Sequence, residues 1–125
     1  MDKIELINLI NSLKLPIKEY CVVSGGSLLM HGIREKTNDL DIAVTETGFK
    51  LLKDKFSPIL INEERKQYKI TDDIECFIEE KLDEDIDIIE GYPCQSLNSV
   101  YKFKKMLNRD KDQKDIINIE KFLKI

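Results

Sequence analysis

Two aspartates, Asp39 and Asp41, are separated by one residue inside an apolar run. Side chains alternate between the faces of a β-strand, so both carboxylates lie on one face while Leu40 and Ile42 point to the other. The rise of a strand puts the two aspartate Cα atoms roughly 7 Å apart. Carboxylates this close repel each other unless a cation lies between them. The pair is therefore a candidate site for Mg²⁺, which prefers oxygen ligands and shares them with substrate phosphates.

An isolated Asp-x-Asp is more often a pair of solvated side chains, so the hypothesis needs a further ligand. Glu75 supplies one, because it lies in a strand predicted over residues 74–78 and faces away from the apolar side chains of that strand. If this strand lies beside the strand of Asp39 and Asp41, three carboxylates converge and can hold two metal ions. Asp73 shares the same face and is the alternative third acid. A charge on the solvated face of an edge strand is the competing interpretation.

A glycine-rich turn, Ser24-Gly25-Gly26-Ser27, follows a strand predicted over residues 20–23. Glycine lets the backbone approach a ligand closely. We expect Ser27 to cap a short helix over residues 28–31, whose N-terminus directs free N–H groups toward an anion. The Ser27 hydroxyl then adds a contact to a phosphate oxygen. The run matches neither the P-loop nor the dinucleotide-binding fingerprint, and two glycines alone more often make an ordinary strand-to-helix turn.

The order of these motifs resembles the DNA polymerase β-like nucleotidyltransferases, in particular their small, minimal members. The resemblance rests on Gly25-Gly26-Ser27, on Asp39-Leu40-Asp41 and on a carboxylate in a later strand. Toward the C-terminus, Lys104, Arg109-Asp110-Lys111-Asp112 and Asp115-Ile116 look like the run seen in AbiEii-like and antibiotic-modifying members. The match covers most of the chain.

The resemblance implies transfer of a nucleoside monophosphate from a nucleoside triphosphate to an acceptor hydroxyl, with release of pyrophosphate. ATP is the expected triphosphate. It implies that Asp39, Asp41 and Glu75 are the catalytic residues and ligate two Mg²⁺ ions, with Mn²⁺ as the substitute. The nucleotide-binding residues that it implies are Gly25, Gly26, Ser27 and Lys104. The acceptor stays open between a small molecule, a tRNA and a protein.

Two other functions stay open. The first is a binding or regulatory module with a nucleotidyltransferase fold, acting as a toxin–antitoxin partner or as a non-catalytic copy, although the intact acids favour catalysis. The second is a protein-interaction domain that uses the acidic segment 72–90. So small a chain could also complete its cleft by forming a homodimer.

Size and composition predict one domain over residues 1–125. The net charge of −4 does not indicate a general nucleic-acid binder. The charge is uneven, since residues 71–90 hold ten acids and one base, whereas residues 101–114 hold six bases and two acids. Three widely spaced cysteines and the absence of a signal-peptide pattern predict a reducing, cytoplasmic location. No apolar run is long enough to span a membrane.

Hydrophobic spacing predicts an α+β fold, a mixed sheet with helices packed on it. The predicted strands are residues 20–23, 40–44, 58–61, 68–70, 74–78 and 86–89. The predicted helices are one ending before Pro16, then residues 28–31, 46–55, 96–107 and 111–123. The apolar residues expected in the core of the last two helices are Phe103, Met106, Leu107, Ile116, Ile119 and Phe122.

Overall fold

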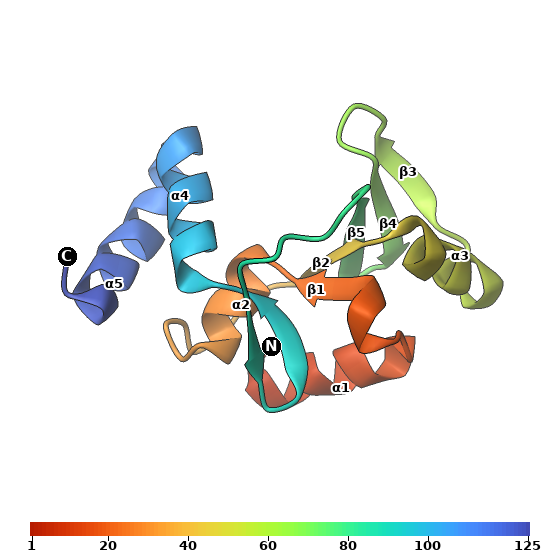
Figure 1. Cartoon of the computed structure of the whole chain (residues 1–125), viewed down its shortest axis with the longest axis horizontal. Helices are drawn as coiled ribbons and strands as arrows, with labels where there is room; N and C mark the ends of the chain where they lie inside the picture. The colour runs from red at the N-terminus through yellow and green to blue at the C-terminus, as the bar shows by residue number, and fades with distance from the viewer.

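The chain folds around one seven-stranded sheet, seen in the computed structural model of residues 1–125 (Figure 1). The α-helices are α1 (Lys3–Leu13), α2 (Ser24–Met30), α3 (Glu46–Lys55), α4 (Leu97–Leu107) and α5 (Gln113–Leu123). The strands are β1 (Tyr20–Val22), β2 (Leu40–Val44), β3 (Ile59–Asn62), β4 (Gln67–Thr71), β5 (Ile74–Ile78), β6 (Ile86–Ile89) and β7 (Tyr92–Gln95). Two short 3-10 helices, η1 (Ile17–Glu19) and η2 (Asp110–Asp112), precede β1 and α5.

The order of strands in the sheet is β3-β4-β5-β2-β1-β7-β6. Strand β2 runs parallel to β5, and β1 runs parallel to β7, whereas the other neighbours are antiparallel. This mixed sheet confirms the predicted α+β fold class. Strands β2 and β5 lie inside the sheet, so their backbones are held by a neighbour on each side.

Helices α1, α2 and α3 cover one face of the sheet. The apolar side chains of β2, which are Leu40, Ile42 and Val44, have no exposed surface. They belong to a core cluster that also contains side chains of all three helices. Because neighbouring residues of a strand point to opposite faces, Asp41 lies on the face that these helices leave open.

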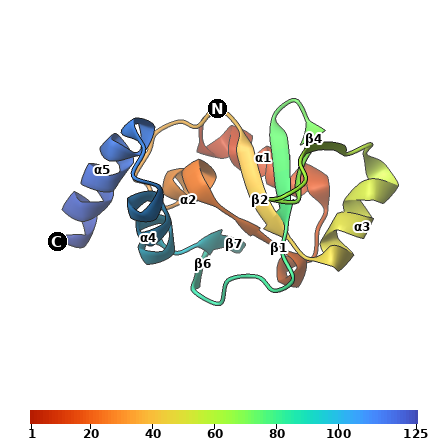
Figure 2. The same ribbon diagram turned by 90° about the horizontal axis from the view of Figure 1, so that it is seen from above.

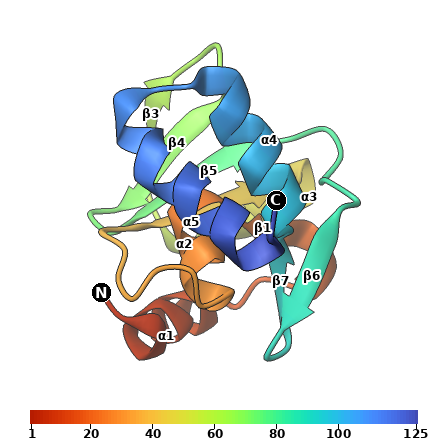
Figure 3. The same cartoon turned by 90° about the vertical axis from the view of Figure 1, so that its left-hand side faces the viewer.

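Helices α4 and α5 lie together at the end of the molecule opposite to α3 (Figure 2), and both face the viewer in Figure 3. A second, smaller core cluster joins them to α2. Its members are Leu28, Leu97, Val100 and Ile119. None of the helices combines the length and the apolar character that crossing a lipid bilayer requires.

The apolar side chains of α4 and α5 are less buried than their spacing predicts. Ile116 and Ile119 are buried, as expected. The core prediction is wrong for Phe103, Met106, Leu107 and Phe122, which are 38%, 72%, 38% and 58% exposed. The two helices form an antiparallel pair at the end of the sheet. Phe103 and Leu107 lie on the side of α4 that faces a cleft, whereas Met106 and Phe122 do not line it.

Most predicted elements agree with the structure. Helix α1 begins at a capping box formed by Asp2 and Glu5, and Thr45 caps α3. Strands β2, β5 and β6 and helix α3 have the predicted bounds. Strands β3 and β4 differ from prediction by about one residue at their ends.

Two local predictions are wrong, and one strand is missing from the prediction. Strand β7 is not expected from the sequence, because Pro93 breaks the usual pattern of a strand. The short second helix begins at Ser24 rather than after Ser27, so it contains both glycines. The last predicted helix is divided into η2 and α5.

Candidate active site

Asp41 and Glu75 occupy directly opposite positions in the parallel register between β2 and β5. Both are half-buried, and both lie on the sheet face that α1, α2 and α3 leave open. The predicted adjacency of the two strands is therefore confirmed.

Asp39 immediately precedes β2 and shares the face of Asp41 by the alternation of side chains. Asp73 lies in the turn before β5 and is exposed. Its carbonyl accepts a hydrogen bond of 2.8 Å from the Leu40 amide, which ties this turn to the start of β2. Of the two alternatives for the third acid, Glu75 is the one in register with Asp41.

The three carboxylates act on one another electrostatically. Burial raises the pKa of Asp41 to about 7, and the negative charges of Asp39 and Glu75 contribute to this rise. Burial also raises the pKa of Asp39, the charge of Glu75 adds to this effect, and the charge of Arg34 opposes it. Like charges shift a pKa in this way only when they are close, so the three groups share one electrostatic site.

Gln67 on β4 holds Glu75 in place. Its side-chain Nε2 donates a hydrogen bond of 2.6 Å to Glu75 Oε1. In the antiparallel register of β4 and β5, Gln67 is opposite Phe77, and Lys69 is opposite Glu75. The sequence pattern does not identify Gln67, because it predicts a strand here without giving the pairing register.

The donor set of this site suits a hard divalent cation. All three side chains are carboxylates, the oxygen donors that Mg²⁺ and Mn²⁺ prefer. The raised pKa of Asp41 marks a concentration of negative charge that a cation would relieve. As placed, no group of three or more His, Cys, Asp or Glu side chains could hold a metal ion. The chemistry of the donors therefore fits a metal, whereas the ligand geometry is not pre-formed.

A cleft of about 1140 Å³ opens beside Asp41. Residues of β1 and β2 form its floor, the β3–β4 turn and β5 form one wall, and α4 and η2 form the other. Of the three predicted acids, Asp41 is the one that lines this cleft. The volume is of the order found for small-molecule sites.

The charged lining of the cleft is mixed in sign. Its basic residues are Arg65, Lys66, Lys81, Arg109 and Lys111, and its acidic residues are Asp41, Glu64, Glu79, Glu80 and Asp83. Positive charge thus reaches the cleft from both walls. The basic residues of the β3–β4 turn carry no signal in the sequence, because turns of this composition are usually solvated.

Ser24, rather than Ser27, lines the cleft. Ser24 is the first residue of α2 and has a left-handed φ of 56°, and its amide donates to Gln95 Oε1 at 3.0 Å. Ser27 has no exposed surface, and its hydroxyl donates to the Gln95 carbonyl at 2.5 Å. The hydroxyl that we expected to contact phosphate is therefore used inside the fold. Strained backbone at a non-glycine residue is common at functional sites.

Both predicted glycines are buried inside α2. A Cβ at Gly25 would lie 2.7 Å from Nη1 of Arg34 and 3.0 Å from Oγ1 of Thr37. A Cβ at Gly26 would lie 3.1 Å from a methyl group of Val22. Close packing is thus what these positions require. The amides of a first helical turn have no partner within the helix. The Ser24 amide is bonded to Gln95 instead, and neither glycine lines the cleft.

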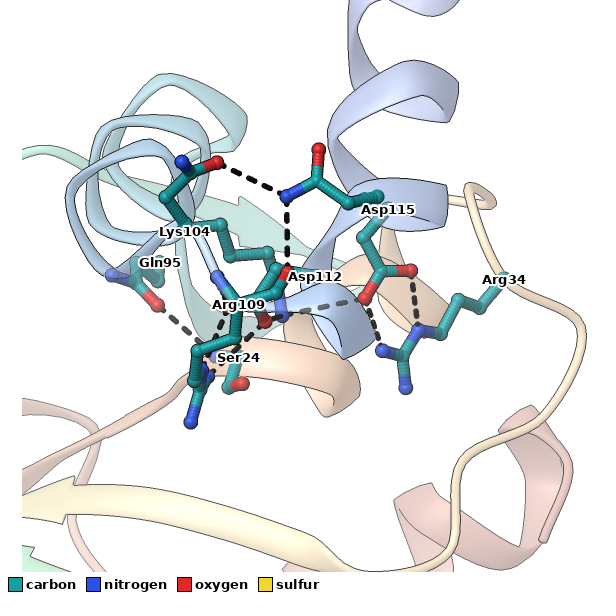
Figure 4. A network of polar contacts seen from close by, with 9 residues as sticks. Ser24, Arg34, Gln95, Lys104, Arg109, Asp112 and Asp115 are labelled. Atoms are coloured by element: carbon teal, nitrogen blue, oxygen red, sulfur yellow. Dashed lines mark hydrogen bonds and ion pairs between the residues drawn. The ribbon is translucent and has the colours of Figure 1, made fainter.

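Lys104 lies in a buried ion-pair network between α4, η2 and α5 (Figure 4). Its Nζ is 3.2 Å from Asp112 Oδ1 and 3.3 Å from Asp115 Oδ2, and the residue is 5% exposed. Lys104 does not line the cleft. The expected approach of Lys104 to a triphosphate is thus replaced, in this arrangement, by two internal ion pairs.

The same network includes Arg34, from the loop before β2, and Arg109, which directly precedes η2. Arg34 Nε donates to Asp115 Oδ1 at 3.0 Å, and Arg34 Nη2 pairs with Oδ2. Burial opposes ionisation of Asp115, yet Arg34 and Lys104 hold its pKa below the usual value. Arg109 donates to Asp112 at 2.7 and 3.1 Å, and these bonds, with Lys104, lower the pKa of Asp112 to about 2. Arg109 and Asp112 therefore form part of the same network as Lys104.

No protein-family model and no curated protein matches the chain. A solved structure does: the crystal structure of "a putative nucleotidyltransferase (TM1012) from Thermotoga maritima" matches 99% of this chain and 96% of that one, with a TM-score of 0.62 and 16% identity. The chain has a nucleotidyltransferase-like fold. The likeness spans nearly the whole of both chains, so the C-terminal helices belong to the nucleotidyltransferase-like fold as the sheet does. At this identity the likeness shows the fold alone.

Proposed function

We propose that this protein is a metal-dependent nucleotidyltransferase, which moves a nucleoside monophosphate from a nucleoside triphosphate to an acceptor hydroxyl. The observation that carries the proposal is the in-register pair of Asp41 and Glu75 beside a cleft of about 1140 Å³. Asp39 is close enough to raise the pKa of Asp41. The nucleotidyltransferase-like fold supports the same function.

Asp39, Asp41 and Glu75 are the proposed ligands of two Mg²⁺ ions, or of Mn²⁺ in their place. Bound metal would neutralise phosphate charge and lower the pKa of the acceptor hydroxyl. Asp41 must lose its proton to serve as a ligand, so its raised pKa makes metal affinity depend on pH near neutrality. Gln67 orients Glu75 by fixing one carboxylate oxygen.

The proposed phosphate contacts are the backbone amides of Gly25 and Gly26, with the hydroxyl of Ser24. All three belong to the first turn of α2, where N–H groups and the helix dipole favour an anion. Lys111 of η2 lines the cleft and takes part in no ion pair, so its charge is free for a phosphate. In this proposal Ser27 and Lys104 support the site from inside the fold.

The proposed chemistry is an in-line displacement at the α-phosphorus. A bond forms between the acceptor oxygen and that phosphorus, the bond to the bridging oxygen breaks, and pyrophosphate leaves with both electrons. The acceptor proton passes to a carboxylate, for which Glu75 is the proposed base. Amide donors and cations fixed around the cleft stabilise the charge that develops.

The test is transfer of label from ATP carrying a labelled α-phosphate, in the presence of Mg²⁺. The acceptors offered are the protein itself, total RNA and a small-molecule extract. We expect Asp41→Asn and Glu75→Gln to lower transfer about 100-fold or more, since each removes a proposed metal ligand. Asp73→Asn, which removes an exposed neighbouring acid, is the matched control and should stay within about twofold of wild type.

Label transfer that persists in Asp41→Asn would contradict the proposal. ATP binding without transfer to any acceptor would instead favour a regulatory module with this fold, acting as a toxin–antitoxin partner or as a non-catalytic copy.

A further inference from the structure

Arg65, in the turn between β3 and β4, lies over the ring of Phe77 on β5. The guanidinium carbon is 4.8 Å from the centroid of the ring. Both residues line the same cleft as Asp41. Guanidinium groups stack favourably on aromatic faces, so Phe77 holds a long, exposed side chain against the wall of the cleft.

Phe77 lies one row along the sheet from the proposed metal site. It follows Glu75 by two residues, so both side chains lie on one face of β5. Its register partner on β2 is Ala43, which in turn follows Asp41 by two residues. The guanidinium therefore lies beside the row of carboxylates rather than at a distant part of the surface.

No carboxylate forms an ion pair with Arg65, although its positive charge acts on Asp41 and opposes the rise in the pKa of that residue. Arg65 takes part in none of the ion pairs of the protein, although Glu63 and Glu64 adjoin it in sequence. Its backbone amide donates a hydrogen bond of 3.1 Å to Asn62 Oδ1, which fixes the turn. The N–H groups of the guanidinium itself donate no hydrogen bond within the protein. An unpaired guanidinium held in a cleft is suited to two parallel hydrogen bonds with a phosphate.

We propose that Arg65, held in place by Phe77, binds the β- and γ-phosphates of the nucleotide. The proposal rests on the proposed function and adds to it that the β3–β4 turn supplies one side of the phosphate site. Lys111 from η2 supplies a cation from the opposite wall. Positive charge on both sides would hold the pyrophosphate as it leaves.

Calorimetric titration with ATP, AMP and tripolyphosphate, each with Mg²⁺, tests this proposal. We expect Arg65→Met to weaken ATP and tripolyphosphate binding about tenfold or more, and AMP binding less than twofold. Phe77→Leu keeps the charge and loses the stacking, so it should weaken ATP binding about threefold. Lys53→Met is the matched control, because Lys53 lies 5.8 Å over the ring of Phe49, outside the cleft. Thermal melting checks that each variant folds.

Equal ATP affinity of wild type and Arg65→Met would overturn the proposal, and so would equal losses for ATP and AMP. If Arg65→Met weakens ATP binding while Asp41→Asn does not, the phosphate contact stands and the proposed metal site fails. If Asp41→Asn weakens ATP binding and Arg65→Met does not, this inference alone fails. Wild-type protein that binds neither ATP nor tripolyphosphate overturns both.

Discussion

Asp41 and Glu75 are directly opposite each other across the parallel pair of β2 and β5, so two carboxylates occupy adjacent positions inside the sheet. Like charges in such positions destabilise a sheet. The arrangement therefore lowers the stability of the fold, and a cation bound between the two carboxylates would offset this cost.

Removing the charge of Asp41 should stabilise the protein. Because its pKa is raised to about 7 in the folded chain, the folded state binds this proton more tightly than the unfolded state, and stability falls as pH rises from about 4 to 7. Asp41→Asn removes that penalty. We expect its free energy of unfolding in urea to exceed that of wild type by about 1–3 kcal/mol near pH 8, with a smaller difference toward pH 4. Lower stability than wild type near pH 8 would show that the charge of Asp41 carries no such penalty.

Releasing Glu75 from Gln67 should impair activity more than stability. Gln67→Leu removes the 2.6 Å hydrogen bond and keeps the volume of the side chain. We expect transfer to fall about tenfold, because a misplaced base or ligand reduces the rate, while stability changes by about 1 kcal/mol or less. Asn11→Leu is the matched control, since it removes a side-chain amide that accepts a hydrogen bond of 2.9 Å from the Tyr92 hydroxyl, and both residues lie outside the cleft. An unchanged kcat in Gln67→Leu would show that Glu75 needs no such support.

Lys104 should matter for folding rather than for nucleotide affinity. Lys104→Met leaves Asp112 and Asp115 buried with less compensation, which typically costs about 3 kcal/mol. The KM for ATP should stay within about twofold of wild type when assayed below the melting temperature. The neighbouring exposed residue supplies the control, Lys105→Met. If Lys104→Met is stable and its KM for ATP rises about tenfold, Lys104 contacts the nucleotide and this prediction is wrong.

Two glycine substitutions should differ in effect because their surroundings differ in stiffness. A Cβ at Gly48 would lie 2.6 Å from the backbone oxygen of Glu19, which cannot move freely, whereas a Cβ at Gly25 meets the far end of the Arg34 side chain. We expect Gly48→Ala to destabilise by about 2 kcal/mol or more and Gly25→Ala by about 1 kcal/mol. Gly25→Ala should lower transfer more strongly, since it displaces Arg34 beside the proposed phosphate contacts. If urea unfolding instead finds Gly25→Ala the less stable of the two, the Arg34 side chain is held more rigidly than the backbone of Glu19.

Strand β2 was predictable because its apolar and polar side chains alternate clearly. Leu40, Ile42 and Val44 predicted a buried face, and that face fixes where Asp41 points. Pairing was less predictable, since nothing in a single strand states its neighbour. The hydrogen bond from Gln67 to Glu75 and the stacking of Arg65 on Phe77 both depend on β4 lying beside β5, which the sequence of either strand does not state.

Residues with two plausible roles were harder to assign. Ser27 follows two glycines, which is typical of a phosphate-binding turn. Helix α2 begins at Ser24, however, so Ser27 lies inside the helix and its hydroxyl donates to the Gln95 carbonyl. Lys104 lies in a segment rich in basic residues, which is also typical of a phosphate-binding surface. Its burial depends on ion pairs with Asp112 and Asp115, and the spacing of α4 alone does not reveal these partners, because they lie in later elements. Helical spacing likewise predicted that Met106 lies in the core. Met106 is exposed instead, because no other element packs against its side of α4.

The most direct measurement is calorimetric binding of a non-hydrolysable ATP analogue with and without Mg²⁺, for wild type, Asp41→Asn, Glu75→Gln and the control Asp73→Asn. A carboxylate metal site predicts that Mg²⁺ strengthens binding to wild type and to Asp73→Asn about tenfold or more, and that both other variants lose this gain. The same gain from Mg²⁺ in Asp41→Asn as in wild type would contradict a metal site at these carboxylates.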